Sequence, residues 1–369
     1  MLVVGARPNF IKIAPIMRAL RGADAFDQML VHTGQHYDAA MSDVFFAELA
    51  LPDPDIHLGV GPGSHAVQTG AVMQAMEPVI ERTSPDLVTV VGDVNSTLAA
   101  ALVAVKKGIP VAHVEAGLRS FDRTMPEEIN RVLTDQISDL LFTTEQEAER
   151  NLVREGIAAS RVVFVGNVMI DSMLHALPRA GPPEQLIARY ATDTSSWTPD
   201  RGFAAATLHR PSNVDDPDKL GTLLSTFGAI AQRLPLVLPL HPRTARAIER
   251  HGLAPLLDRP GLLSIPPQPY LAMLGLLKGA RLVLTDSGGI QEETTGLGVP
   301  CLTLRDNTER PITVSEGTNR VVGTEPAPVL AAVDEILASG GKRGRIPPLW
   351  DGRAAERIAQ HLAHYFELA

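Results

Sequence analysis

Short apolar runs alternate with stretches of helical spacing along this chain. Residues 2–4, 86–91 and 109–114 are apolar runs of strand length, and a polar turn and a helical pattern follow each of them. The alternation starts again at residue 204. Runs that are apolar throughout are typical of parallel strands buried on both faces. The pattern therefore predicts an α/β protein with doubly wound parallel sheets.

Residues 177–200 interrupt the alternation. Proline, glycine and serine are frequent there, which predicts linker and loop. The expected strands on either side of this interruption are residues 2–4, 29–33, 86–91, 109–114, 138–143 and 161–165, and residues 204–208, 235–240, 262–265, 282–284, 299–304 and 320–322.

Residues 281–298 contain the clearest candidate site. An apolar run at 282–284 leads into the turn 285–289, and we expect Ser287 to cap a helix that begins at about Ile290. A strand, a glycine-containing turn and a helix N-terminus together form an anion site, because free N–H groups and the positive end of the helix dipole meet there.

Gly288 and Gly289 allow the backbone to approach a phosphate or pyrophosphate closely. Glu292 and Glu293 are expected in the first turn of the helix, and a carboxylate just beyond a phosphate site suits ribose hydroxyls. The alternative is a capped helix without a ligand, because a single Gly-Gly turn is a weak motif.

Carboxylates stand near the ends of expected strands in the first half of the chain. Asp93 and Glu115 follow apolar runs, and Glu127 comes after Pro126 at an expected helix start. Asp93 also suits a helix N-cap and Glu127 suits the positive end of a helix, so structural roles stay open for both. A glutamate that ends an apolar strand is harder to explain as a cap and suits acid–base chemistry.

Basic residues gather at strand ends as well. Arg7 and Lys12 accompany the first expected helix and suit a phosphate or a leaving group that gains charge, although both could be ordinary surface residues. Several histidines and arginines at strand ends in the second half indicate a binding site for an anionic ligand. These residues are His209, Arg210, His241, Arg243 and Arg310.

Composition narrows the class of protein. The 369 residues favour two domains, and the net charge of −9 argues against a general nucleic-acid or membrane-surface binder. Cys301 is the single cysteine, and no apolar run reaches the length of a membrane helix, so we expect a cytoplasmic protein. The sequence has no P-loop, no Gly-x-Gly-x-x-Gly at its first strand, no Gly-x-Ser-x-Gly and no metal-ligand spacing on one element.

Ten segments, taken in order, resemble the non-hydrolysing UDP-N-acetylglucosamine 2-epimerases. The resemblance runs over nearly the whole chain. The segments are GARPNFIKIAPI (5–16), TGQHYD (33–38), GDVNSTLAA (92–100), HVEAGLRS (113–120), PEEINR (126–131), GN (166–167), LHRPSN (208–213), PLHPRT (239–244), TDSGGIQEE (285–293) and RDNTERPI (305–312).

The resemblance implies two Rossmann-like domains in the GT-B architecture with an active site in the cleft between them. It places a first domain at residues 1–168, completed by a C-terminal helix at 352–369, and a UDP-binding domain at 169–351. It also implies a homodimer that needs no cofactor or metal and that interconverts UDP-N-acetylglucosamine and UDP-N-acetylmannosamine.

The resemblance also assigns site residues by position. The catalytic candidates are Asp93, Glu115, Glu127 and His209. The candidates for binding substrate and UDP are Arg7, Lys12, His241, Ser287, Gly288, Gly289, Glu293 and Arg310. The candidates for an allosteric or sugar site are Gln35, His36 and Gln68.

The reaction implied is elimination of UDP across C1–C2, giving a 2-acetamidoglucal, followed by re-addition of UDP. Three alternatives stay open: a hydrolysing 2-epimerase, a 2-epimerase of a modified UDP-N-acetyl sugar, and a GT-B glycosyltransferase. Many members carry Glu-Ala where this chain has Asn9-Phe10, which leaves the substituents of the sugar open.

Overall fold

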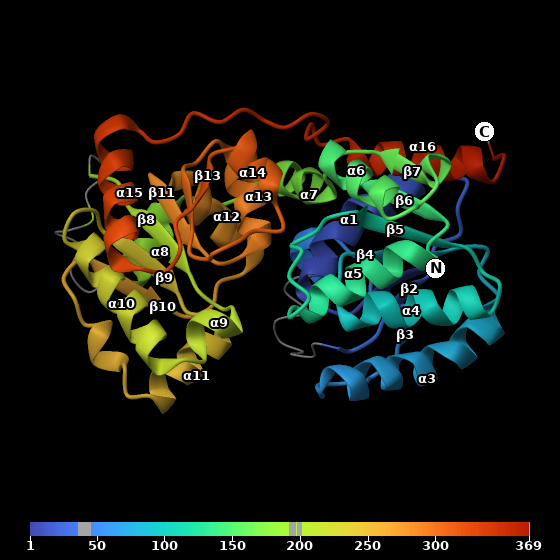
Figure 1. Cartoon of the computed structure of the whole chain (residues 1–369), viewed down its shortest axis with the longest axis horizontal. Coiled ribbons are helices and arrows are strands. Elements are labelled where there is room, and N and C mark those ends of the chain that lie inside the picture. Colours follow the sequence, from blue (N-terminus) through green and yellow to red (C-terminus); the bar gives the residue numbers. More distant parts are fainter. Residues whose placement is uncertain (36–45, 192–196, 198–200, 369) are drawn as a thin grey trace. The chain divides into compact units, whose positions relative to one another are not determined.

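The computed structural model describes residues 1–35, 46–191, 197 and 201–368. The chain forms two compact units (Figure 1). Unit 1 consists of Met1–His175 and Pro348–Ala369, and unit 2 consists of Ala176–Pro347. Each unit contains one parallel sheet with helices on both faces, so the prediction of two doubly wound domains is confirmed.

The sheet of unit 1 has seven strands in the order β3-β2-β1-β4-β5-β6-β7. The chain leaves β1 toward β2 and β3 and then returns to the other side of β1 as β4, so the direction of winding reverses between β1 and β4. The strands are β1 Leu2–Val4, β2 Leu30–His32, β3 Ile56–His57, β4 Val88–Val91, β5 Val111–Ala116, β6 Leu140–Thr143 and β7 Val162–Phe164.

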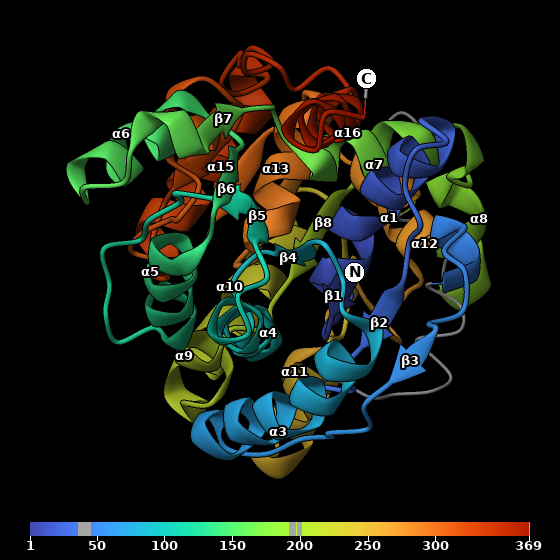
Figure 2. The same cartoon turned by 90° about the vertical axis from the view of Figure 1, so that its right-hand side faces the viewer.

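Helices cover both faces of this sheet (Figure 2). On one face α3, α4 and α5 lie side by side, and Met76 and Val103 pack with Val90 of the sheet. On the other face α1 packs against α16, and His361 of α16 meets the ring of Phe142 with their centroids 5.6 Å apart. The helices are α1 Arg7–Gly22, α3 His65–Thr83, α4 Asn95–Lys106, α5 Pro126–Ile137, α6 Gln146–Arg154, α7 Val168–Ala176 and α16 Ala354–Tyr365.

The segment that follows unit 2 is fixed firmly to unit 1. The indole Nε1 of buried Trp350 donates to the carbonyl oxygen of Thr144 at 3.1 Å. The carboxylate of Asp171 in α7 accepts from the backbone N–H groups of Ala354 (3.2 Å) and Ala355 (2.7 Å), so a side chain of α7 caps the N-terminus of α16. Burial raises the pKa of Asp171 to about 6 against those two hydrogen bonds.

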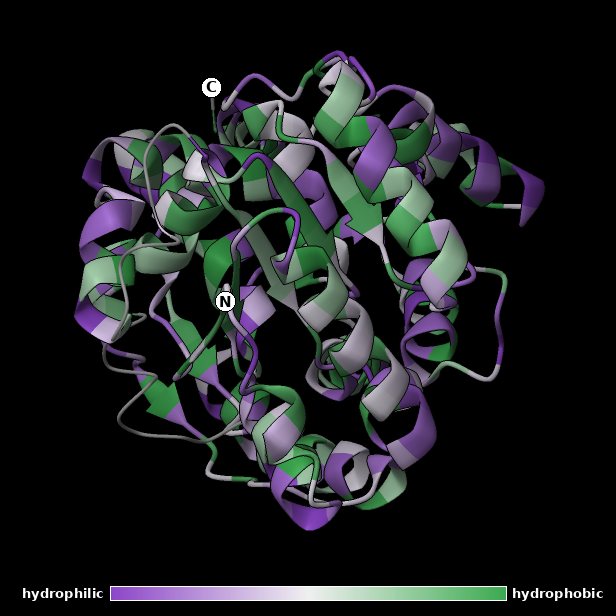
Figure 3. Ribbon diagram, turned by 90° about the vertical axis from the view of Figure 1, so that its left-hand side faces the viewer, coloured by the Kyte–Doolittle hydropathy of each residue, from purple (hydrophilic) through white to green (hydrophobic). Residues whose placement is uncertain are grey.

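The sheet of unit 2 has six strands in the order β10-β9-β8-β11-β12-β13, and its winding reverses between β8 and β11. Its strands are mostly apolar, whereas the covering helices alternate polar and apolar residues (Figure 3). The strands are β8 Ala204–Thr207, β9 Leu236–Pro239, β10 Leu262–Ile265, β11 Leu282–Thr285, β12 Cys301–Thr303 and β13 Asn319–Val321.

Two apolar clusters fill the faces of this second sheet. Leu223 and Phe227 of α10 pack with Val333 of α15 on one face, and Ile187 of α8 packs with Leu276 of α12 on the other. The helices are α8 Pro183–Tyr190, α9 Pro211–Val214, α10 Pro217–Ala231, α11 Pro242–Arg250, α12 Tyr270–Gly279, α13 Gly288–Leu297, α14 Pro311–Ser315 and α15 Pro326–Ser339.

Two local predictions are wrong. The expected linker contains α8, because Pro183 occupies the first helical position, where the missing N–H of proline costs no hydrogen bond. Helix α13 begins at Gly288 rather than at about Ile290, so Glu292 and Glu293 fall in its second turn and not in its first. Over the part of the chain that the structure describes, every helix is too short or too polar to cross a bilayer.

Candidate active site

The turn between β11 and α13 lies where the winding of unit 2 reverses, the position at which open α/β sheets bind ligands. Ser287 occupies the N-cap position with extended backbone, but among the described residues its side chain makes no capping hydrogen bond, so that part of the prediction is wrong. Instead its backbone N–H donates to the hydroxyl of Thr285 at 3.0 Å. Helix geometry leaves the first N–H groups of α13, including those of Gly288 and Gly289, without partners inside the helix.

Glu309 and two arginines surround this turn. A Cβ added at Gly288 would lie 2.7 Å from Oε1 of Glu309, so any side chain there collides with that carboxylate. Arg210 donates to Oε1 of Glu309 at 3.1 Å and Arg305 donates to Oε2 at 2.7 Å. Arg310 lies beside them and pairs with Glu292, with 2.9 Å between Nε and Oε1. The carboxylate of Glu309, held by two arginines, therefore lies against the N-terminus of α13.

His209 follows β8 and pairs with Asp286, which follows β11. Its Nδ1 lies 2.9 Å from Oδ1 of Asp286, and the backbone N–H groups of His209 and Arg210 also donate to this carboxylate. Burial acts to raise the pKa of Asp286, but the His209 ring and those N–H groups outweigh it and hold the pKa below its ordinary value. An ionised Asp286 fixes a proton on Nδ1 of His209, which leaves Nε2 as the atom that can accept or deliver a proton.

Glu293 is buried in the second turn of α13, close to Tyr270 at the start of α12. Burial raises the pKa of Glu293 to about 7, a hydrogen bond from Tyr270 lowers it, and the charge of Glu292 raises it. His241, after β9, is exposed and caps α11 by accepting the N–H of Arg243 at 3.2 Å.

In unit 1 the candidate residues lie at or beyond the carboxyl ends of β1, β4 and β5, and the winding reverses between β1 and β4. Nζ of Lys12 lies 2.5 Å from Oε2 of Glu115, and both side chains are buried. Glu115 has a left-handed φ of +72° at a bulge between β5 and β6, a conformation that is unfavourable for a residue with a side chain. Strain of this kind concentrates at functional sites.

Asp93 is not a helix N-cap, because Val94 occupies that position of α4. Its carboxylate instead pairs with the guanidinium of Arg131 in α5. Its side chain is 20% exposed, so a ligand can reach the carboxylate. Glu127 lies in the first turn of α5, as predicted, and one helical turn before Arg131 on the same side of the helix. Arg7 is the first residue of α1 and is partly exposed.

Gln35 and Gln68 are buried in a hydrogen-bond network that joins the loops of unit 1. Oε1 of Gln35 accepts from the hydroxyl of Ser96 at 2.7 Å. Nε2 of Gln68 donates to the carbonyl oxygen of Gln35 at 3.1 Å, and Asn95 donates to Oε1 of Gln68 at 2.8 Å. These contacts give both glutamines a structural role. His36 lies outside the described residues.

Asn9 is buried near the start of α1 and makes three hydrogen bonds through its side chain. Its side-chain oxygen accepts from the backbone N–H groups of Gly5 (3.1 Å) and Ala6 (3.0 Å), and its amide donates to the carbonyl oxygen of Val91 at 2.9 Å. Asn9 thus ties the turn after β1 to the end of β4.

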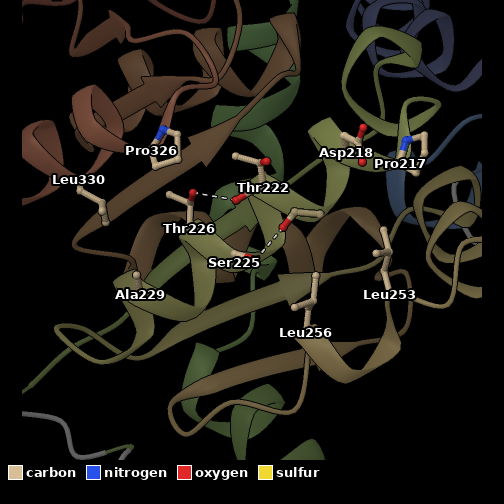
Figure 4. Close-up of a pocket in the computed structure, with 11 residues that line it drawn as sticks. Pro217, Asp218, Thr222, Ser225, Thr226, Ala229, Leu253, Leu256, Pro326 and Leu330 are labelled. Atoms are coloured by element: carbon tan, nitrogen blue, oxygen red, sulfur yellow. Dashed lines mark hydrogen bonds between the residues drawn. The ribbon is translucent and has the colours of Figure 1, made fainter.

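Several functional partners were not predicted from the sequence. Asp286 and Arg131 lay within matched segments, but their pairing with His209 and Asp93 joins residues far apart in the chain. A groove of about 540 Å³ on unit 2, between α10, α15 and the 3₁₀ turn Ala254–Leu256, contains none of the candidate residues (Figure 4). Among the described residues no cluster of three His, Cys, Asp or Glu side chains could hold a metal ion.

Known proteins resemble the chain over nearly its full length. A family model described as UDP-N-acetylglucosamine 2-epimerase matches residues 18–363. The UDP-N-acetylglucosamine 2-epimerase of Methanocaldococcus jannaschii is 43% identical over 366 residues, with 98% of each chain covered. The UDP-2,3-diacetamido-2,3-dideoxy-D-glucuronate 2-epimerase of Pseudomonas aeruginosa is 43% identical over 372 residues, again with 98% of each covered.

The crystal structure of the M. jannaschii enzyme in complex with UDP-GlcNAc and UDP matches this chain with a TM-score of 0.89 at 41% identity, covering 98% of this chain and 99% of that one. Each of the two parallel sheets has candidate site residues at the point where its winding reverses. Together with this structural likeness, the two sheets define an epimerase of the GT-B architecture, as predicted. The chain belongs to the UDP-N-acetylglucosamine 2-epimerase family.

Proposed function

We propose that this chain interconverts UDP-N-acetylglucosamine and UDP-N-acetylmannosamine by inverting C2 of the sugar. The observation that carries the proposal is the set of carboxylates around the ends of β4 and β5. Asp93 and Glu115 stand there, each held by a cation, and Glu127 lies one helical turn before Arg131, the cation that pairs with Asp93. Epimerisation needs proton exchange on both faces of C2, and therefore more than one acid–base group.

In the proposed reaction a carboxylate of this set removes the proton from C2. The electron pair of the C2–H bond forms the C1=C2 double bond, and the C1–O bond breaks with its electron pair leaving on UDP. The products are UDP and 2-acetamidoglucal. Re-addition of UDP to C1, with proton delivery to the opposite face of C2, completes the inversion.

The leaving UDP gains negative charge, which the groups of unit 2 are suited to stabilise. The first N–H groups of α13 supply positive charge at this turn. The guanidinium groups of Arg210 and Arg305 offset the charge of Glu309, and that of Arg310 offsets the charge of Glu292. We assign the pyrophosphate to this turn, the ribose to Glu293, and a further proton-transfer role to His209.

A modified substrate is the second candidate, because the P. aeruginosa relative, named for a diacetamido uronate, is as similar in sequence as the M. jannaschii enzyme. Purified protein is incubated in D2O with UDP-N-acetylglucosamine, and separately with UDP-2,3-diacetamido-2,3-dideoxy-D-glucuronate, and the products are read by NMR. We expect the 2-epimer with deuterium at C2 from the preferred substrate.

Other products would contradict the proposal. Free N-acetylmannosamine with UDP indicates a hydrolysing enzyme. Retention of the C2 proton rules out elimination with solvent exchange. Transfer of the sugar only when an acceptor is added indicates a glycosyltransferase.

We also propose a homodimer, as the resemblance implies. Exposed apolar side chains support it: Ile129 and Leu133 lie one turn apart on α5, and Phe121 precedes that helix. Light scattering after gel filtration should give twice the chain mass, and Leu133→Glu should reduce it to one chain mass. A monomer at micromolar concentration would contradict the proposal.

A further inference from the structure

The side chain of Arg131 is among the largest that are fully buried in the described chain. Its Nη1 donates to Oε2 of Glu128 at 2.6 Å, and its Nη2 pairs with Oδ2 of Asp93. The guanidinium group therefore bridges two carboxylates, one in its own helix and one on the turn after β4.

Stability alone is a poor reason for such an arrangement. Removing a guanidinium and its partners from water costs about as much as their attraction returns, and apolar side chains of similar volume often serve a core equally well. Arg131 lies in the interior, whereas the carboxylate of Asp93 is partly open to solvent. The buried guanidinium group of Arg131 thus holds a carboxylate that a ligand can reach from solvent.

Helix α5 holds the turn that carries Asp93 at a second point. The side-chain amide of Asn130 donates to the carbonyl oxygen of Asp93 at 3.0 Å and to Oδ1 of Asn95 at 3.1 Å. Two successive residues of α5 therefore fix the backbone and the carboxylate of one turn, which limits how far Asp93 can move.

The other carboxylate extends the network to the loop before α5. Glu128 accepts the backbone N–H groups of Ser120 (2.9 Å) and Phe121 (3.0 Å), and Phe121 has a left-handed φ of +58°. Through Glu128, Arg131 is connected to a strained loop that leads directly to Glu127.

We propose that Arg131 is a positioning residue, which orients the carboxylate of Asp93 for proton transfer at the sugar and acts on the reaction through Asp93. This inference rests on the proposed 2-epimerase function. A guanidinium group that holds two carboxylates through different nitrogens fixes how they lie relative to each other, which the point charge of lysine does not. A displacement of about 1 Å at a reacting group costs on the order of 10²-fold in rate.

The first test compares turnover with binding in the full chain. Arg131→Gln should lower kcat about 10²-fold with little change in KM. Arg131→Lys keeps the positive charge and should recover part of this loss in kcat. Arg357→Gln is the matched control, because Arg357 pairs with Asp351 in the same unit, away from the candidate residues. We expect it to lose stability and to keep kcat.

The second test asks whether Arg131 acts through Asp93. Asp93→Asn alone should lower kcat by about 10² to 10⁴-fold, and adding Arg131→Gln should lower it no further. Losses that multiply in the double variant, or wild-type kcat in both Arg131 variants, would overturn the proposal.

A third measurement does not depend on activity. Hydrogen–deuterium exchange of residues 92–97 should be faster in Arg131→Gln than in wild type and unchanged in Arg357→Gln. Unchanged exchange in Arg131→Gln overturns the positioning role even if the wild type converts no UDP-sugar. A wild type without epimerase activity refutes the proposed function separately.

Discussion

The buried carboxyl of Glu293 makes the binding of UDP dependent on pH. Burial raises its pKa to about 7, from a value of 4.5 for an ordinary glutamate. Ribose hydroxyls donate to a carboxylate, so UDP should bind the ionised form. About a tenth of the protein is ionised at Glu293 at pH 6 and about nine tenths at pH 8, so the apparent Kd for UDP should fall about tenfold between these pH values.

Isothermal titration of UDP from pH 6 to pH 8 measures this effect. UDP itself has a phosphate that titrates near pH 6, so the measured quantity is the ratio of Kd between Glu293→Gln and wild type. The glutamine variant keeps the shape of the side chain but has no proton to lose. The ratio should therefore rise about tenfold from pH 6 to pH 8.

A second variant tests the cause of the pKa. The hydrogen bond from Tyr270 lowers the pKa of Glu293, so Tyr270→Phe should move the transition in UDP affinity to higher pH. A ratio of Kd that stays constant from pH 6 to pH 8 would refute the assignment of the ribose to Glu293. A Tyr270→Phe transition at lower pH would refute the electrostatic explanation.

Three further predictions follow from the contacts described. Gly288→Ala places a methyl group against Glu309 and should weaken UDP binding at least about tenfold in a titration while the fold is kept; unchanged affinity would remove the pyrophosphate from this turn. Asp286→Asn frees the His209 ring and should lower kcat about 10²-fold; wild-type turnover would exclude a proton-transfer role for His209. The pKa of Asp171, raised from 3.8 to about 6, means that the free energy of unfolding falls by about 3 kcal/mol as the pH rises through this range, and denaturant titrations of Asp171→Asn should lack this fall.

The sequence predicted the sheets well because a strand buried on both faces is apolar throughout. Residues 282–284 and 109–114 are such runs, and each overlaps a strand of the structure, β11 and β5 respectively. Helix limits were less accurate because glycine and proline, which end many helices, also begin them. Gly288 opens α13 and Pro183 opens α8, and the sequence analysis had placed both in turns or loops.

The candidate site was predicted only as a set of strand ends. Which side chains meet depends on the order of strands, and pairs such as Asp93 with Arg131 are separated by 38 residues. The spacing of residues within one segment of the sequence does not predict such a pair. The sequence also could not show that the side chains of Gln35 and Gln68 belong to one buried hydrogen-bond network. One lies in a loop and the other in a helix, and no sequence pattern indicates that the two are in contact.

Unit 1 is built from the chain segments that precede and follow unit 2 in the sequence, and this has a consequence for folding during synthesis. Helix α16 buries Ile358 and Leu362 and packs against α1, yet it is synthesised after all of unit 2. At ordinary rates of translation, residues 176–347 take roughly 10 to 35 s to emerge from the ribosome. During that time the apolar side of α1 lacks its cover, so the nascent chain is a candidate for chaperone binding until α16 docks.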